Sequence, residues 1–349
     1  MIGAHAPLLV LALSLATLIP LSAQADGDDL DLALPTENDA LFHGGGAEFY
    51  QHIERNYQGT ITKPWQGGQY GFVRNPVATP EGQIYTRFHE GIDIRPLHRD
   101  ARGEPLDEVR AMAAGTVVYT NRVPGFSNYG NYVVVEHRWD GLFYYSLYGH
   151  LGSISARTGE RVPRGGALGV LGYTGEGLNQ ERAHVHLELN LMLSRNYDSW
   201  HAKLFPADPN RHGIYNGVNL AGVNIARLFL ELHQRPHLTI PEFLAEEEAF
   251  YRVRIPAEKA LYLTNAYPWL LRAKSDANAQ SYEVSFTAGG VPVKVAPQTT
   301  AVAEPQLTFV KPRNVDYSFL TRGQVGGRAD GGALTDSGKH LMQLLTWPD

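Results

Sequence analysis

The segment AHVHLELN, residues 183–190, alternates polar and apolar side chains along most of its length. Successive side chains of a β-strand point to opposite faces, so its histidines, glutamate and asparagine share one face, and its valine and leucines share the other. The apolar face suits a protein core. We therefore expect a buried strand that presents two imidazoles, His184 and His186, on its polar face.

Two further segments carry histidines in a strand-like pattern. In RFHEGIDI, residues 87–94, an extended chain places His89 and Asp93 on one face, and the intervening Gly91 is expected to leave room for an ion. In FYYSLYGHL, residues 143–151, His150 shares a face with three hydroxyl-bearing residues. A catalytic zinc site takes three His or carboxylate ligands, and spare imidazoles beside it transfer protons. The three segments together therefore predict a hydrolytic zinc site.

The motifs H-x-G-I-D, Y-x-H-L and H-x-H, in this order, resemble those of the lysostaphin-type (LytM-like) zinc metallopeptidases, which cut peptide bonds in bacterial peptidoglycan. The similarity extends over roughly residues 67–193. The resemblance implies that His89, Asp93 and His186 bind one Zn²⁺ per chain. It implies that His150 and His184 are catalytic and flank the metal-bound water, and it leaves open which of the two is the general base.

The function implied by the resemblance is that of an exported zinc-dependent endopeptidase, which hydrolyses peptide cross-links of peptidoglycan with a metal-activated water. Its partners would be peptidoglycan peptide stems. Two alternatives stay open, because a motif specifies a reaction more than a substrate. One is a cell-wall binding or regulatory protein with an inactive or closed site, and the other is a zinc peptidase of exported proteins.

Composition excludes several other classes. The chain has 349 residues and a net charge of −6, without a basic block, so no nucleic-acid partner is expected. It contains no cysteine, which excludes disulfides, a cysteine-ligated zinc and a thiol nucleophile. Any metal must be held by His, Asp and Glu.

The N-terminus has the pattern of a signal peptide. Residues 1–25 carry no Lys, Arg, Asp or Glu, and an apolar run over 7–21 leads into Ala23-Gln24-Ala25. This run is shorter than the roughly 20 residues of a spanning helix, which favours cleavage near Ala25 over an uncleaved anchor. We expect a periplasmic or secreted protein with no membrane span after signal removal.

The remaining chain divides into parts that differ in amino-acid composition and secondary-structure pattern. Residues 26–61 are expected to form an acidic linker with a short helix in AEFYQHIERNY, residues 47–57. Residues 62–212, rich in short β-branched and aromatic runs, are expected to form the zinc metallopeptidase domain. Its predicted fold is mainly β, a compact antiparallel sheet with a groove, and the resemblance makes it lysostaphin-like.

Residues 213–349 are expected to form a C-terminal α+β extension of unknown role. Helical periodicity covers 223–233, and a capping-box pattern, Thr239 with Glu242, opens the next helix. Strand-like runs follow at 281–288, 291–297 and 307–312, and a last helix is predicted at 337–345.

Several other residues have two readings. Glu188 either orients a histidine or is a carboxylate on the sheet face, and Tyr132 and Tyr148 either line the groove or pack. His98 and His137 are expected to be structural or solvated. The charged segment 95–115 and the segment GLNQERAH, residues 177–184, are expected to reshape the groove wall.

Overall fold

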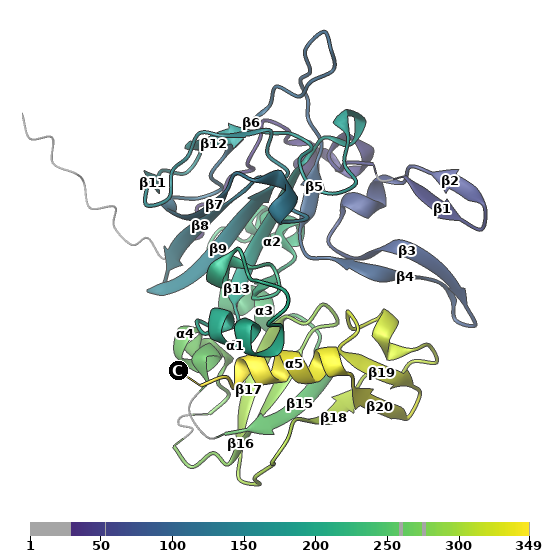
Figure 1. Cartoon of the computed structure of the whole chain (residues 1–349), viewed down its shortest axis with the longest axis vertical. Coiled ribbons are helices and arrows are strands. Elements are labelled where there is room, and N and C mark those ends of the chain that lie inside the picture. Colours follow the sequence, from purple (N-terminus) through teal and green to yellow (C-terminus); the bar gives the residue numbers. More distant parts are fainter. Residues whose placement is uncertain (1–28, 53, 258–260, 274–276, 349) are drawn as a thin grey trace, which may run out of the picture.

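The computed structural model describes residues 29–348, apart from 53, 258–260 and 274–276 (Figure 1). The expected signal peptide, residues 1–25, lies outside the described residues. Within the described ranges, no helix is both long and apolar enough to cross a membrane.

An antiparallel sheet of seven strands forms the upper part of the molecule in Figure 1. Six strands follow the order β11-β7-β8-β9-β13-β14, and the seventh, β5, pairs with β13 beside β14. The strands are β5 (Ile92–Ile94), β7 (Gly115–Asn121), β8 (Tyr132–Trp139), β9 (Leu142–Gly149), β11 (Arg161–Val162), β13 (Val185–Met192) and β14 (Leu220–Gly222). The expected mainly β, antiparallel fold is confirmed.

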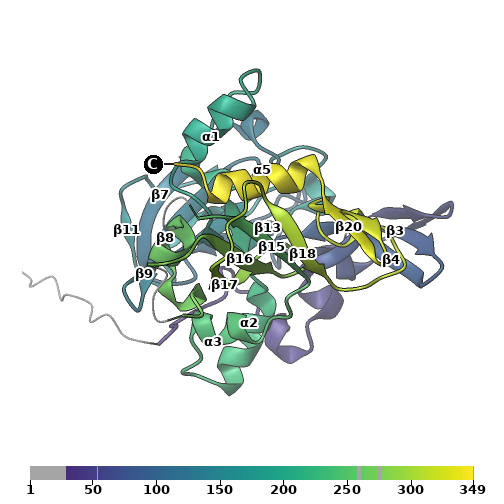
Figure 2. The same ribbon diagram turned by 90° about the horizontal axis from the view of Figure 1, so that it is seen from below.

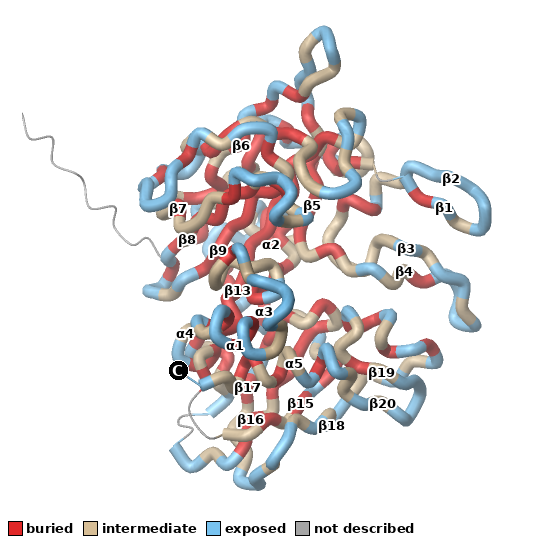
Figure 3. The backbone as a smooth tube through the Cα atoms, viewed as in Figure 1, coloured by how far each residue is buried: buried red, intermediate tan, exposed pale blue. Residues whose placement is uncertain are grey.

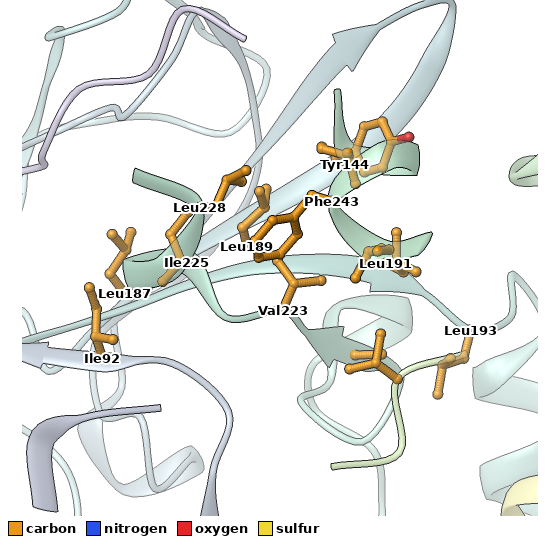
Figure 4. Close-up of a cluster of buried hydrophobic side chains, with 14 of the residues drawn as sticks. Ile92, Tyr144, Leu187, Leu189, Leu191, Leu193, Val223, Ile225, Leu228 and Phe243 are labelled. Carbon is orange, nitrogen blue, oxygen red and sulfur yellow. The ribbon is translucent and has the colours of Figure 1, made fainter. Parts of the chain in front are cut away.

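Strand β13 lies inside the sheet and is buried along its entire length. Figure 4 shows its leucines facing helices α2 (Ile225–Gln234) and α3 (Ile240–Ala245), with Leu189 beside Phe243. The opposite face carries His186, Glu188 and Asn190, all buried. The alternation in the sequence therefore separates a packed core from a polar face, as predicted.

Short sheets and hairpins border the central sheet. Strands β6 (Glu108–Arg110), β10 (Ser153–Ile154) and β12 (Ala167–Val170) form one small sheet. Two hairpins, β1 (Arg55–Tyr57) with β2 (Thr60–Thr62) and β3 (Gly71–Thr79) with β4 (Gly82–His89), project from the same side of the molecule (Figure 1). The 3₁₀ turns are η1 (Ala40–His43), η2 (Gly46–Glu48), η3 (Trp65–Gly68), η4 (Pro124–Phe126), η5 (Gln180–Arg182), η6 (Gly213–Tyr215), η7 (Pro268–Leu270) and η8 (Tyr317–Phe319).

The helix expected in residues 47–57 is not formed. The segment contains the end of η2, then an extended stretch in which Tyr50 bridges Ile94, and then strand β1. Gln51 N donates to Asp93 O at 2.9 Å, so the chain here adds to the edge of β5. Phe49 and Tyr50 are both buried in this extended arrangement. Pairing with a distant strand overrides the local periodicity.

The C-terminal part has the expected α+β composition. From residue 251 onward it lies in the lower half of Figure 1, whereas α2 lies beside the central sheet. Its sheet has the order β17-β16-β15-β18, with a separate hairpin β19–β20. The predicted capping box of Thr239 and Glu242 is present at α3. Besides α2 and α3, its elements are α4 (Tyr262–Ala266), α5 (Asp336–Leu345), β15 (Tyr251–Pro256), β16 (Ser281–Phe286), β17 (Pro292–Gln298), β18 (Gln306–Val310), β19 (Val325–Arg328) and β20 (Gly331–Leu334). Helix α1 (Tyr197–Leu204) precedes this part in the chain.

The two parts share packing, and buried segments run through both in Figure 3. The C-terminal part also contacts the β3–β4 hairpin, beside which β20 lies in Figure 2. Arg313 Nη2 pairs with Glu81 Oε2 at 2.7 Å, and Arg322 Nη2 pairs with Glu90 Oε1 at 2.7 Å. The strand that ends at His89 is thus held at both ends by C-terminal residues.

One buried histidine of the central sheet titrates abnormally. The His137 ring lies with Nδ1 2.8 Å from Ala114 O and Nε2 2.7 Å from Ser146 Oγ. Burial lowers the pKa of His137 to about 4, although the hydrogen bond to the Ala114 carbonyl opposes the shift. In an unfolded chain the histidine pKa is about 6.5, so between these values only the unfolded state takes up this proton.

We therefore expect His137 to cost about 3 kcal/mol of stability as the pH falls from 7 to 4. A His137→Gln variant, which keeps a donor and an acceptor but does not titrate, should lose less stability over this range. Denaturant unfolding of both proteins at pH 7 and pH 4.5 measures the difference. Parallel losses in the two proteins would contradict the prediction.

Candidate active site

Three neighbouring strands of the central sheet, together with β4 of a separate hairpin, bring the five predicted residues together. In the register of the central sheet, His186 of β13 lies opposite Asp93 of β5 on one side and Gly149 of β9 on the other. His150 follows β9, and His184, which precedes β13, forms a bridge with Gly172. His89 comes from another sheet, as the last residue of β4.

Three donor atoms converge at one point. His186 Nδ1 lies 3.0 Å from Asp93 Oδ1 and 3.0 Å from His89 Nε2, and the distance from His89 Nε2 to Asp93 Oδ1 is 3.1 Å. Ligand atoms around a tetrahedral Zn²⁺ at 2.0–2.1 Å are separated by about 3.3 Å, so this triangle is close to one face of such a site. His89, Asp93 and His186 also form the one group of potential metal ligands found in the described part of the chain.

Each ligand candidate has a partner on its other polar atom. His89 Nδ1 lies 2.8 Å from Gln69 O, and His186 Nε2 lies 2.7 Å from Glu188 Oε1. When these nitrogens carry the protons, His89 Nε2 and His186 Nδ1 keep lone pairs that point toward the Asp93 carboxylate. Such outer partners commonly fix the tautomer of a metal-binding histidine. The donor set therefore fits a divalent cation of the zinc class.

The electrostatics also favour a cation at this point. Burial opposes protonation of His186, yet hydrogen bonds to Asp93 and Glu188 raise its pKa to about 10. The pKa of Asp93 is held well below its usual range, against the effect of its burial, by His184, His89 and Arg74. The site thus keeps Asp93 ionised and holds a positive charge between Asp93 and His186, where a metal ion would replace the proton.

The other two histidines flank this point. Nδ1 of His150 lies 2.8 Å from Thr174 O, and Nδ1 of His184 lies 2.7 Å from Arg182 O, which leaves Nε2 of each ring without a carbonyl partner. His184 Nε2 is 3.4 Å from Asp93 Oδ1, and the centroids of the His150 and His184 rings are 4.6 Å apart. Burial, followed by the charges of His184 and His186, holds the pKa of His150 well below its usual value, so this ring is neutral and able to accept a proton.

His150 has a left-handed backbone, with φ of 62°. This conformation is uncommon for a residue with a side chain and is often found at functional sites. It is stabilised by the His150 N–H, which donates to Tyr129 O at 2.7 Å.

Three supporting groups could not be recognised from the sequence. Arg74 of β3 pairs through Nη2 with Asp93 Oδ2, and its Nε donates to Gly67 O at 2.9 Å. Tyr129 Oη donates to Glu188 Oε1 at 2.7 Å. The third group, the Gln69 carbonyl, is a backbone atom. None lies in a motif that marks its role.

The structure distinguishes between the alternative roles that the sequence left open for several other residues. Glu188 hydrogen bonds His186, as the orienting role requires. Tyr148 is fully buried and its Oη accepts the Met112 N–H, so it packs. Tyr132 borders the groove but is also fully buried, and it packs in a cluster with Val134 and Tyr145. His137 is structural and His98 is exposed, and neither lies in the groove.

The expected room for an ion at Gly91 and the expected place of the segment 95–115 in the groove wall were both wrong. A Cβ on Gly91 would lie 2.3 Å from Leu187 O, so this glycine admits the close approach of β13 and not an ion. The segment 95–115 does not line the groove. Four of its residues instead line a separate cavity of about 470 Å³: Arg95, Pro96, Arg99 and Gly103. In the segment 177–184, only Arg182 lines both the cavity and the groove, and Glu54 also lines both.

All five site residues line one open groove of about 1420 Å³. Its other walls come from the β1–β2 and β3–β4 hairpins, from residues 124–129 and 175–178, from residues 216–218 and from Arg322. Residues from both the central and the C-terminal parts of the chain therefore line the groove.

Comparison with known proteins gives a family match for this region. The model of peptidase family M23 matches residues 87–198, a range that contains all five site residues. No curated protein matches the chain. Three solved structures resemble parts of it, all with TM-scores below 0.5, so the superpositions add no argument to the sequence match.

A Pseudomonas aeruginosa protein designated peptidase M23 is 24% identical, with a TM-score of 0.23, over 40% of this chain and 48% of its own, less than half its length. A variant catalytic domain of the prophage-encoded M23 protein EnpA from Enterococcus faecalis is 22% identical over 41% and 82%, with a TM-score of 0.26. The catalytic domain of the antimicrobial peptidase lysostaphin from Staphylococcus simulans is 25% identical over 34% and 76%, with a TM-score of 0.24. Over residues 87–198 the chain is thus similar to peptidase family M23.

Proposed function

We infer that the protein is an exported zinc-dependent endopeptidase that hydrolyses peptide cross-links of bacterial peptidoglycan. The observation that carries this proposal is the triangle of His89 Nε2, Asp93 Oδ1 and His186 Nδ1, with two further imidazoles beside it in an open groove. The family match supports the reaction class, and the uncharged, apolar residues 1–25 support export.

The geometry supports the following proposed roles for these residues. His89, Asp93 and His186 would hold a zinc ion, which would supply Lewis acidity for activating water and polarising the scissile carbonyl. The free Nε2 of His150 or His184 accepts a proton from the attacking water as the water oxygen bonds to the carbonyl carbon. The proton then passes to the amine nitrogen as the carbon–nitrogen bond breaks.

The open groove favours an enzyme over a closed-site binding protein. His89, Asp93, His150, His184 and His186 all line the same open space. A bound peptide can therefore approach the ligand triangle and the two proton-transfer groups at once, which hydrolysis requires.

The test is digestion of purified peptidoglycan by the chain from residue 26 onward and by its His89→Ala variant, both supplied with zinc. We expect the wild type to release muropeptides and the variant to release few, because one of three ligand candidates is missing. Equal release by both proteins would refute the proposal. A parallel casein digestion distinguishes a peptidase of exported proteins, which would cleave casein and leave the wall intact.

A further inference from the structure

Arg55, in strand β1, is a buried arginine that has no acidic partner in the part of the chain that the structure describes. Its side chain lines the groove, yet the residue is only 7% exposed. None of its Nε, Nη1 and Nη2 atoms meets a hydrogen-bond acceptor among the described residues. Its neighbour is Tyr85, whose ring centre lies 5.1 Å from Cζ, and the phenol of Tyr85 gives it some electrostatic compensation.

A guanidinium stays charged in proteins, and burying it without a counter-ion is costly. Burial is also the main cause that lowers the pKa of Arg55, and the charge of Arg74 acts in the same direction. Glu54, the adjacent carboxylate, lines the groove but forms no ion pair with Arg55. The groove is the side from which a compensating anion can approach.

The surroundings of Arg55 add positive charge. Arg74 and Arg87, directly opposite each other in the β3–β4 hairpin, line the same groove. Arg74 is engaged by Asp93, whereas Arg87 is exposed and forms no ion pair within the described ranges. On the opposite wall, by contrast, Arg322 is already paired with Glu90. Two uncompensated guanidinium groups, Arg55 and Arg87, therefore lie at the hairpin end of the groove.

We propose that Arg55, with Arg87, forms a carboxylate-binding subsite that recognises a free carboxylate of the peptide substrate beside the bond to be cut. The proposal rests on the proposed peptidase function. The guanidinium face lies over the Tyr85 ring, and the N–H groups in its plane remain for the two oxygens of a carboxylate. Because Arg74 contacts both this end of the groove and Asp93, the subsite adjoins the metal ligands.

The experiment compares a cross-linked stem-peptide dimer that has free carboxylates with dimers in which one carboxylate at a time is a carboxamide. We expect one amidation to raise KM about 10- to 100-fold for the wild type, the range for a hydrogen-bonded charge pair, with little change in kcat. Arg55→Gln should reduce this discrimination to less than about threefold, and Arg55→Lys should retain part of it because lysine keeps the charge without the fork.

Arg138→Gln is the matched control. Its guanidinium also lies over an aromatic ring, that of Phe143, with Cζ 5.9 Å from the ring centre, but outside the groove. We expect this variant to discriminate as the wild type does. If Arg55→Gln misfolds, it will lose both zinc and activity on the amidated dimer. In that case, the discrimination measured for Arg55→Lys decides whether the subsite exists.

Calorimetric binding of the single-stem product peptides, acid and amide, separates this inference from the proposed function. A wild-type preference for the acid that Arg55→Gln abolishes supports the subsite even when no cleavage is found, a result that would refute the peptidase proposal alone. A wild type that binds and cleaves acid and amide equally overturns the subsite and leaves the peptidase proposal intact. Discrimination that persists in Arg55→Gln also overturns the subsite.

Discussion

A His150→Ala variant is expected to keep its zinc and to lose about 10²- to 10⁴-fold in kcat, the usual contribution of a positioned proton-transfer group. His150 lies outside the ligand triangle, and its Nδ1 is held by Thr174 O, so its removal leaves His89, Asp93 and His186 in place. The measurement combines kcat on a defined cross-linked peptide with the zinc content of the purified protein.

The control for this prediction is His201→Ala. His201 is also buried, but it packs against Trp200 and Phe205 in and after α1, away from the groove. This variant should retain its kcat. If His150→Ala lost its zinc, His150 would be a ligand, and if it kept full activity, its catalytic role would be excluded.

A His89→Ala variant is expected to bind zinc more than about 100-fold more weakly than the wild type, because loss of an outer partner alone typically costs 10- to 100-fold. His89 supplies one corner of the triangle through Nε2. Titration against a chromophoric chelator at pH 7.5 measures the affinity, and zinc should no longer raise the melting temperature of the variant.

Glu188→Gln provides a graded comparison with this variant. It keeps the size of the side chain and an oxygen near His186 Nε2 but removes the charge, so a loss of about 10- to 100-fold in zinc affinity is expected. Wild-type zinc affinity in His89→Ala would show that the metal is bound elsewhere. A larger loss in Glu188→Gln than in His89→Ala would contradict the assigned ligand set.

Much of the fold was predictable because local pattern and tertiary environment agree. Strand β13 alternates leucines with polar residues, and the structure places the leucines against α2 and α3. The capping box of Thr239 and Glu242 depends on residues three apart, so the start of α3 is visible locally. The segment around Tyr50 was mispredicted because its conformation depends on pairing with Ile94, a partner far away in the chain.

The candidate site was only partly predictable for the same reason. His89, Asp93, His150, His184 and His186 stand in short motifs, so their residue types and spacing predict a shared chemistry. Arg74 occupies no such motif, and its contact with Asp93 exists only because the β3–β4 hairpin folds back over β5. Similarly, Gly91 is needed because β13 approaches it closely, whereas its position in the sequence alone predicted that it leaves room for an ion.

By itself, the sequence determined the strand alternation, the helix starts and the five candidate site residues, because each depends on residue types at short, regular spacings. Only the tertiary structure decided how these side chains are oriented and what surrounds them. It set the 3.0–3.1 Å triangle and tied Nδ1 of His89 and His150 to distant carbonyls. It also left Arg55 buried in the groove without a counter-ion among the described residues. Hydrogen bonds and burial join residues far apart in the chain, so they exist only once the chain has folded.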